Sequence, residues 1–572
     1  MLHLKKVERP RELTWYQAAA MLYGDWGTSK AYVLGIAFSL AGRSSWFILL
    51  LMSALTATVG LCYMTICRVY PDGGGVYSAV RERSRMLAVV GALLLVADYV
   101  VTASLSALDA FHYLHLPYPE IWAISAILFI ALLNWFGPSK SGQAATLVAI
   151  LAAGCVLVLF CFAAPHLGAM RLEKPTGGLV HTWQSFVGIV LALSGVEAVA
   201  NMTGIMKTPV ERTAKRAIWP VLIEVAVFTF LLGLVMHAVP GLSGHTEDML
   251  SALGEHFVGR WFSVVISIVF GLLLISAVNT AIGDLVSIQF LMSKDGELPG
   301  VFSKLNRFGM PWIALLVSCA VPAAILLFEH DLVKLAALYA IGVVGAITLN
   351  LGSCSTNPAI PLKRIERIML FVVAAILFFV EITIAFQKHQ ALLFAGSIVG
   401  IGLLLRAGSK MLVPVRSVYA TNIEVLTVSE AMEIAPLYRS SSMVALRSPN
   451  ETLLQEAILR TRALGEQAIY VQTIEEAPVG AGVTEIEPSE NSLKLLDWAS
   501  KEIARHGLHP IPLWQMGEHA GTLLAKAASD LEIVMMMIGT SRRSNMVRLL
   551  RGDVFKTLAG RLPKACHLSI IS

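Results

Sequence analysis

The chain has 572 residues, of which 56% are hydrophobic and only 15% are charged, and its net charge is +5. Soluble domains usually carry about 25% charged residues, so this composition excludes a soluble enzyme, a disordered chain and a fibrous protein. Most of the sequence is expected to lie in a bilayer. Lys and Arg outnumber Asp and Glu by 28 to 22 in residues 1–413, but the counts are 16 and 17 in residues 414–572. This distribution argues against a partner that is a nucleic acid.

Twelve mainly apolar stretches are long enough to cross a membrane as helices, because one span needs about 20 such residues. In chain order they are residues 14–38, 45–66, 86–112, 121–137, 143–164, 183–206, 217–239, 261–292, 311–328, 332–352, 368–386 and 390–407. We therefore predict an all-α polytopic membrane protein over residues 1–413. An even number of spans places both termini on one side of the membrane.

The distribution of Lys and Arg predicts which side that is. With the N-terminus inside, the inner segments before the twelfth helix carry 19 Lys and Arg, and the outer segments carry six. Basic residues are enriched in cytoplasmic loops. We therefore expect a multi-pass protein of the cytoplasmic (inner) membrane with both termini cytoplasmic.

Residues 414–572 have shorter apolar runs that alternate with amphipathic helical patterns. The predicted strands are 441–448, 467–474, 508–514, 531–539 and 566–571, and the predicted helices are 450–465, 492–506, 518–529 and 553–562. Asn450 and Ser492 are the expected N-caps of the first two helices. Alternating strands and helices predict a parallel sheet, so residues 414–572 are expected to form a separate α/β domain.

Two of the predicted spans are interrupted by glycine at mid-membrane. The first contains the sequence YGDWGTS over residues 23–29, with Asp25 in its centre, and the sixth contains Ser194, Gly195 and Glu197. Packing glycines are common in spanning helices. However, two interrupted helices in corresponding positions, each with a carboxylate and hydroxyls, favour a transporter with inverted repeats.

The third span carries Asp98, Thr102 and Ser106 at a spacing of four residues, which places them along one helical face. A hydroxyl in a span often bonds only its own preceding turn. A carboxylate costs at least about 2.5–3.5 kcal/mol at the bilayer centre, so such a residue usually faces a cavity. This stripe is therefore a candidate wall of the same site.

The side chains gathered in this way are all oxygen ligands. Carboxylates, hydroxyls and carbonyls suit hard cations, and carbonyl and hydroxyl oxygens can replace the hydration shell of K⁺. No His or Cys joins them, which argues against zinc or copper. Six of the seven cysteines fall in or beside apolar segments, where Cys behaves as a small hydrophobe.

These residues resemble a known family. Residues 23–32 read YGDWGTSKAY, which is similar to the first-helix motif YGDIGTSPLY of the KUP/HAK/KT potassium uptake transporters. Residues 70–77, YPDGGGVY, resemble the glycine-rich turn after the second helix in the amino acid–polyamine–organocation superfamily. Residues 98–102 and 194–198 are similar to the third and sixth helices of KimA-type potassium importers. The resemblance covers all twelve spans and implies a LeuT-like five-plus-five inverted repeat.

The resemblance also implies a function, that of a proton-coupled potassium importer. Its cation would be held by six side chains, namely Asp25, Tyr32, Thr102, Ser106, Ser194 and Tyr339. Glu197 corresponds to the residue that couples proton movement, and Asp98 is the next candidate for that role. The importer would require no cofactor and would not be an enzyme.

Lys30 departs from the family motif, because the related proteins carry an apolar residue or Pro there. Its ammonium either pairs with Asp25 and occupies the cation site, or points away and leaves the site intact. Two other functions stay open. An amino-acid or polyamine transporter would use the same scaffold, although Asp25 would repel a substrate carboxylate. A membrane sensor that has lost transport would be consistent with an intruding Lys30.

The tail resembles the universal stress protein family, whose nucleotide loop reads G-x-x-G-x9-G-S/T. Gly539 and Gly552 match two of its glycines, but Arg542 replaces the middle glycine and Asp553 replaces the final hydroxyl residue. Gly539, Arg542 and Gly552 are the candidate phosphate contacts. A carboxylate beside a phosphate is unfavourable, which weakens the case for nucleotide binding. We expect the tail to regulate transport and to form the interface of a homodimer.

Overall fold

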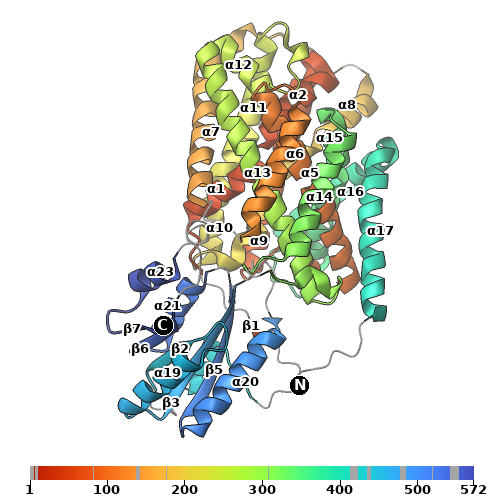
Figure 1. Ribbon diagram of the computed structural model, residues 1–572. Coiled ribbons are helices and arrows are strands. Elements are labelled where there is room, and N and C mark those ends of the chain that lie inside the picture. The colour runs from red at the N-terminus through yellow and green to blue at the C-terminus, as the bar shows by residue number, and fades with distance from the viewer. Residues whose placement is uncertain are drawn as a thin grey trace.

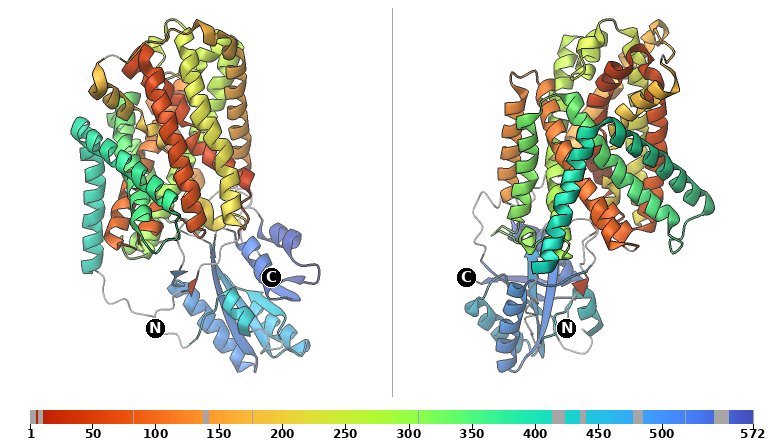
Figure 2. Two further views of the ribbon diagram at one scale, coloured as in Figure 1. Left: turned by 180° about the vertical axis from the view of Figure 1, so that it is seen from behind. Right: turned by 90° about the vertical axis from the view of Figure 1, so that its right-hand side faces the viewer.

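The computed structural model consists of a bundle of long helices with an α/β part at one end (Figure 1). It describes residues 5–6, 11–81, 83–136, 142–175, 177–306, 308–412, 423–434, 440–476, 485–517, 519–540 and 553–571. The expected domain boundary near residue 413 lies outside these residues. In both views of Figure 2 the α/β part lies at the end of the bundle where α1 begins and α17 ends.

The helical part follows the predicted order of spans. Its first half comprises α1 (Trp15–Trp26), α2 (Ser29–Ala41), α3 (Ser45–Val69), α4 (Val76–Arg81), α5 (Arg85–Tyr113), α6 (Pro119–Trp135), α7 (Gly142–Ala163), α8 (Gly178–Gly188), the 3₁₀ turn η3 (Val190–Leu193) and α9 (Ala198–Met202). Its second half comprises α10 (Val210–Ile223), the π-helical turn η5 (Glu224–Phe228), α11 (Thr229–Val235), α12 (Met249–Phe257), α13 (Arg260–Lys294), α14 (Trp312–Phe328), α15 (Leu332–Thr356), α16 (Arg364–Gln387) and α17 (His389–Leu412).

The count of twelve spans is not confirmed by length and composition. Among the described residues, eight helical stretches are long and apolar enough to cross a membrane, or nine if the bent pair Gly178–Gly188 and Val190–Ile205 forms one span. Trp15–Val69 counts once, although it covers two of the predicted spans. The helices α6 and α14 have 17 residues each. They are therefore about 25 Å long, slightly less than the hydrocarbon thickness.

Both predicted helix interruptions are present. The first span divides into α1 and α2 at residues 27–28, and in the sixth span residues 194–197 separate η3 from α9. The sixth span also bends by 46° at residue 189, between Gly178–Gly188 and Val190–Ile205. Between them, α5 packs along both α13 and α15. The two interruptions and α5 define the centre of the helical part.

The tail forms the expected parallel sheet. Five strands, β2 (Ser442–Ala445), β3 (Ala468–Glu476), β5 (His509–Gly517), β6 (Met535–Gly539) and β7 (His567–Ile571), pair in the order β5-β3-β2-β6-β7. The helices are α18 (Val428–Ile434), α19 (Glu451–Ala463), α20 (Glu490–Arg505), α21 (Ala520–Asp530) and α23 (Val554–Arg561). Every pairing is parallel.

One of the two expected caps is correct and the other is wrong. The Asn450 side chain accepts a hydrogen bond from the backbone N–H of Leu453 at the start of α19. The cap of α20 is Ser489, because its hydroxyl accepts from the N–H of Ser492. Ser492 therefore lies inside the helix, and the first turn of α20 begins earlier than its apolar pattern indicates.

Contacts within the described part of the chain join the tail to the helical part. The short strand β1 (Lys5–Lys6) pairs antiparallel with β4 (Glu485–Ile486). The guanidinium of Arg561 bonds the Glu12 carboxylate at 2.7 Å. Gly309, in the connection before α14, lies against the backbone carbonyl of Glu476 at the end of β3. The tail is thus held against the end of the helical part.

Candidate functional site

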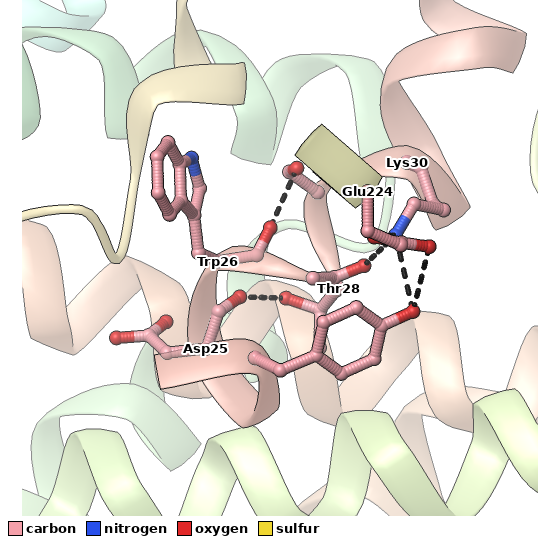
Figure 3. A network of polar contacts seen from close by, with 8 residues as sticks. Asp25, Trp26, Thr28, Lys30 and Glu224 are labelled. Atoms are coloured by element: carbon pink, nitrogen blue, oxygen red, sulfur yellow. Dashed lines mark hydrogen bonds and ion pairs between the residues drawn. The ribbon is translucent and has the colours of Figure 1, made fainter. Parts of the chain in front are cut away.

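The interruption of the first span leaves backbone carbonyls without helical partners, and neighbouring hydroxyls bond them. Thr28 Oγ1 donates to the Asp25 carbonyl at 2.5 Å, and Ser29 Oγ donates to the Trp26 carbonyl at 2.8 Å. Figure 3 shows this network from close by. A break inside a membrane needs such internal partners. The hydroxyls of the sequence GTS therefore stabilise the break by bonding its carbonyls. The Asp25 carboxylate takes no part in this network.

The interruption of the sixth span lies directly against that of the first. Gly195 has φ +87°, a conformation that favours glycine. A Cβ built on Gly195 would lie 2.6 Å from the Trp26 nitrogen and 2.9 Å from the Asp25 Cγ. Only a residue without a side chain allows the two breaks to approach this closely.

The helix α5 joins these breaks to α15. Thr102 Oγ1 lies 3.0 Å from Tyr339 Oη and 3.3 Å from Asp98 Oδ1. A Cβ on Gly342, one turn beyond Tyr339, would lie 2.6 Å from the Asp98 nitrogen. The Tyr339 hydroxyl of α15 therefore lies against Thr102 on the polar stripe of α5.

Three of the predicted carboxyl groups are buried together at this centre. Asp25, Asp98 and Glu197 are 6%, 0% and 4% exposed. Their charges interact electrostatically with one another. Among the described residues, neither carboxylate oxygen of Glu197 has a side-chain hydrogen-bond partner. Such a group is costly in its charged form unless a cation or a proton neutralises it.

The structure adds a fourth carboxylate that the sequence analysis missed. Asp284 of α13 interacts electrostatically with both Asp25 and Glu197. It lies within the predicted span 261–292, so the same signal, an ionisable residue inside a span, was available for it. The centre therefore holds more carboxyl groups than the two glycine-interrupted motifs indicate.

Tyr32, Ser106 and Ser194 are also buried, with exposures of 3%, 1% and 3%. The phenol of Tyr32, on α2, lies close enough to Asp25 and Asp98 to interact with their charges. Ser106 follows Thr102 by one turn of α5, and Ser194 immediately precedes Gly195. All three therefore belong to the elements that form the centre.

Lys30 points away from Asp25, as Figure 3 shows. Its ammonium donates to Glu224 Oε2 at 2.6 Å, to the Gly27 carbonyl at 3.1 Å and to Tyr23 Oη at 3.2 Å. This geometry agrees with the expectation in which Lys30 leaves the cation site intact. Glu224 was not singled out in the sequence, although it also falls within a predicted span.

A comparison with known protein families shows to which family this chain belongs. A family model described as amino acid permease matches residues 13–404, which include every one of these groups. The chain belongs to the amino acid permease family. It is therefore a membrane transporter and not an enzyme.

Individual relatives of this permease transport different solutes. Potassium transporter KimA of Bacillus subtilis (strain 168) is 28% identical over 379 residues, which cover 59% of this chain and 60% of KimA. Polyamine transporter RMV1 of Arabidopsis thaliana is 23% identical over 311 residues, or 50% of this chain and 61% of RMV1. The matches thus span about three fifths of each relative.

The permease is similar to a solved structure with a TM-score of 0.46. That structure is of the Eremococcus coleocola manganese transporter in complex with an aromatic bis-isothiourea substituted compound. The sequence identity is 14%, and the match covers 70% of this chain and 92% of that chain.

The candidate phosphate loop of the tail is described only in part. Gly539 ends β6, whereas Arg542 and Gly552 lie outside the described residues. Asp553 is the N-cap of α23, and its side chain accepts from the N–H of Phe555 at 2.9 Å. Asp553, which replaces the hydroxyl residue of the family's loop, therefore serves as the N-cap of α23.

Proposed function

We propose that this permease is a potassium importer that uses the proton gradient, as a K⁺/H⁺ symporter. The observation that carries the proposal is the buried carboxylate of Asp25 at the contact between two helix breaks, which has no ion-pair partner among the residues that the structure describes. Lys30, the cationic side chain nearest to it in the sequence, is bonded to Glu224 instead. A buried anionic centre of this kind favours a cation over a substrate carboxylate.

The proposed ligands are six oxygen-bearing side chains around this centre, namely Asp25, Tyr32, Thr102, Ser106, Ser194 and Tyr339. Hydroxyl, phenol and carboxylate oxygens can replace the hydration shell of a monovalent cation. The similarity to KimA supports K⁺ as that cation.

Proton coupling is assigned to Glu197, with Asp98 as the second candidate. Both are buried beside Asp25, and the charges of all three interact. A proton on Glu197 would relieve the repulsion that its charge exerts on Asp25. Symport then requires that Glu197 stays protonated while K⁺ lies against Asp25, so that both cross in the same half-cycle.

We further propose that the chain crosses the cytoplasmic membrane twelve times, with an inverted repeat and with both termini in the cytoplasm. The tail, residues 414–572, would then be a cytoplasmic regulatory domain that pairs in a homodimer. The position of the α/β part at the end where α1 begins supports this topology, as does the distribution of Lys and Arg.

One observation favours a second function, the transport of a polyamine. Four interacting carboxyl groups, Asp25, Asp98, Glu197 and Asp284, exceed what a single monovalent ion neutralises. A flexible polycation would match several of them at once, and RMV1 is a polyamine transporter. The sensor hypothesis rested on an intruding Lys30, and the pairing of Lys30 with Glu224 removes that support.

The experiment that tests the proposal is ion flux into proteoliposomes containing the full-length protein. Potassium influx is measured with and without an imposed inward proton gradient, and spermidine is added as a competitor. Influx that the proton gradient accelerates and that spermidine does not inhibit supports K⁺/H⁺ symport. Spermidine uptake without potassium influx contradicts it and supports the polyamine transporter.

A further inference from the structure

The ammonium of Lys30 has no hydrogen-bond donor left for another group. Its three N–H bonds point to three acceptors, the Glu224 carboxylate, the Gly27 carbonyl and the Tyr23 hydroxyl. An ammonium has only three donors. It also lies 4.7 Å from the centre of the Tyr23 ring, and the side chain is completely buried.

Both carboxylate oxygens of Glu224 accept hydrogen bonds from the residues around the Lys30 ammonium. Its Oε2 accepts from Lys30, while its Oε1 accepts from the Tyr23 hydroxyl at 2.9 Å. Tyr23 lies on α1 and Lys30 on α2, so the Glu224 carboxylate bonds both sides of the first helix break. Figure 3 shows Lys30 and Glu224 on one side of the break and the Asp25 side chain on the other.

Glu224 stands next to a local distortion of its own helix. Pro220 lies inside α10 and has no backbone N–H. The π-helical turn η5 starts at Glu224 itself. Such turns are rare and occur frequently at functional sites. The carboxylate therefore lies at the junction of α10 with the π-helical turn.

Without Glu224, the positive charge of Lys30 would be buried without an anionic partner. Asp25 precedes Lys30 by five residues across the break, and its carboxylate is also buried. A long, flexible Lys side chain and an unpaired buried carboxylate attract strongly in a medium of low dielectric constant. The same ammonium would then compete with the transported cation.

We propose that Glu224 is a positioning residue that holds the Lys30 ammonium out of the cation site and so keeps Asp25 available to K⁺. This inference rests on the proposed cation site at Asp25. It explains how a chain that carries Lys in the first-helix motif retains an anionic centre. A purely structural role is the alternative, in which the pair only stabilises the packing of α2 against η5.

The test compares three full-length variants in the potassium flux assay. Glu224→Gln keeps the shape of the side chain but removes its charge, so the KM for K⁺ should rise by at least about tenfold while flux at saturating K⁺ falls less. The double variant Lys30→Met with Glu224→Gln removes the competing ammonium, and its KM should return to within about twofold of the wild type. Glu211→Gln, an exposed change on the same helix, is the matched control and should behave as the wild type.

Each outcome decides the inference. An unchanged KM in Glu224→Gln overturns it, as does a double variant that is as impaired as the single one, because a structural role predicts no rescue. If Glu224→Gln does not reach the membrane, Glu224→Asp is tested in its place. Its KM for K⁺ should rise by a smaller factor, and the additional change Lys30→Met should reverse that rise. A wild type without any potassium influx contradicts the proposed function itself, whereas normal wild-type influx with an unchanged variant contradicts only the role of Glu224.

Discussion

Gly195 lies against the side chain of Asp25, so that a Cβ on this glycine would be 2.9 Å from the Asp25 Cγ. The two residues belong to the sixth and the first span and are 170 positions apart in the sequence. Their contact brings the two helix interruptions together at one point. The Asp25 carboxylate of the first break therefore lies directly against the backbone of the second break.

Gly195→Ala should abolish transport without preventing membrane insertion. The new methyl group would meet the Trp26 nitrogen at 2.6 Å, and the φ of +87° adds strain of about 1–3 kcal/mol. The two breaks must separate, which moves Asp25 away from its neighbours.

The matched control for this change is Gly241→Ala. Gly241 has a similar φ of +80°, but nothing lies within 4 Å of a Cβ built there. Flux and thermal stability are measured for both variants at equal membrane levels. Equal flux in the two variants would mean that the contact between the breaks has no role in transport.

Asp25→Asn should abolish potassium uptake or reduce it strongly. The change keeps the shape of the side chain but removes the charge that neutralises a dehydrated cation in a low-dielectric site. Uptake is measured at a range of potassium concentrations in a host that lacks its own potassium uptake. Normal affinity and rate at an equal membrane level would show that the cation binds elsewhere.

Much of this arrangement could be predicted from the sequence. Both breaks contain glycine beside hydroxyl residues, and the polar stripe of α5 has a helical spacing, so Asp25, Asp98, Thr102 and Glu197 were identified from local pattern. The tail strands were also found, since alternating apolar runs depend mainly on neighbouring residues. Asn450 was correctly identified as a cap for the same reason.

What could not be predicted depends on contacts between distant segments. The partner of Lys30 is 194 residues away, and no local pattern states which way that side chain turns. Asp284 was missed although it stands inside a predicted span, where an ionisable residue is itself a signal of function. The predicted spans at α6 and α14 are not confirmed by length, because helices of 17 residues are slightly shorter than the hydrocarbon thickness.

Tyr339→Phe should raise the KM for potassium several-fold and leave the protein level unchanged. The change removes the hydroxyl that lies 3.0 Å from Thr102 Oγ1. A hydrogen bond of this kind contributes about 0.5–1.5 kcal/mol. Tyr118→Phe is the control, because that side chain is 70% exposed. An unchanged KM for Tyr339→Phe would remove Tyr339 from the set of ligands.

Gly309→Ala should loosen the contact between the tail and the helical part. A Cβ on Gly309 would lie 2.1 Å from the carbonyl oxygen of Glu476, and the φ of +78° is already unfavourable for alanine. We expect faster cleavage of the tail by added protease and an altered rate of uptake, with normal membrane insertion.

The control for Gly309→Ala is Gly296→Ala, which has a φ of +74° but nothing within 4 Å of its Cβ. Both variants are compared by protease digestion in membranes and by flux. A loosened tail with unchanged flux would contradict the proposed regulatory role of residues 414–572, while leaving the transport proposal intact.

Glu197→Gln should keep potassium transport but remove its dependence on the proton gradient. Glu197 is 4% exposed, its carboxylate oxygens have no side-chain hydrogen-bond partner among the described residues, and its charge repels that of Asp25. Glutamine has the shape of the protonated carboxyl and cannot release a proton. The variant is therefore fixed in the state that the symport mechanism assigns to the potassium-loaded site.

The measurement is potassium influx into proteoliposomes with and without an imposed pH gradient. In the wild type, an inward proton gradient should accelerate influx, because each loaded half-cycle carries a proton on Glu197. In Glu197→Gln, both conditions should give the same influx, with a KM for potassium close to that of the wild type. If the variant still responds to the gradient as the wild type does, Glu197 is not the coupling residue. Asp98→Asn is then the next variant to test, because the Asp98 charge interacts with both Glu197 and Asp25.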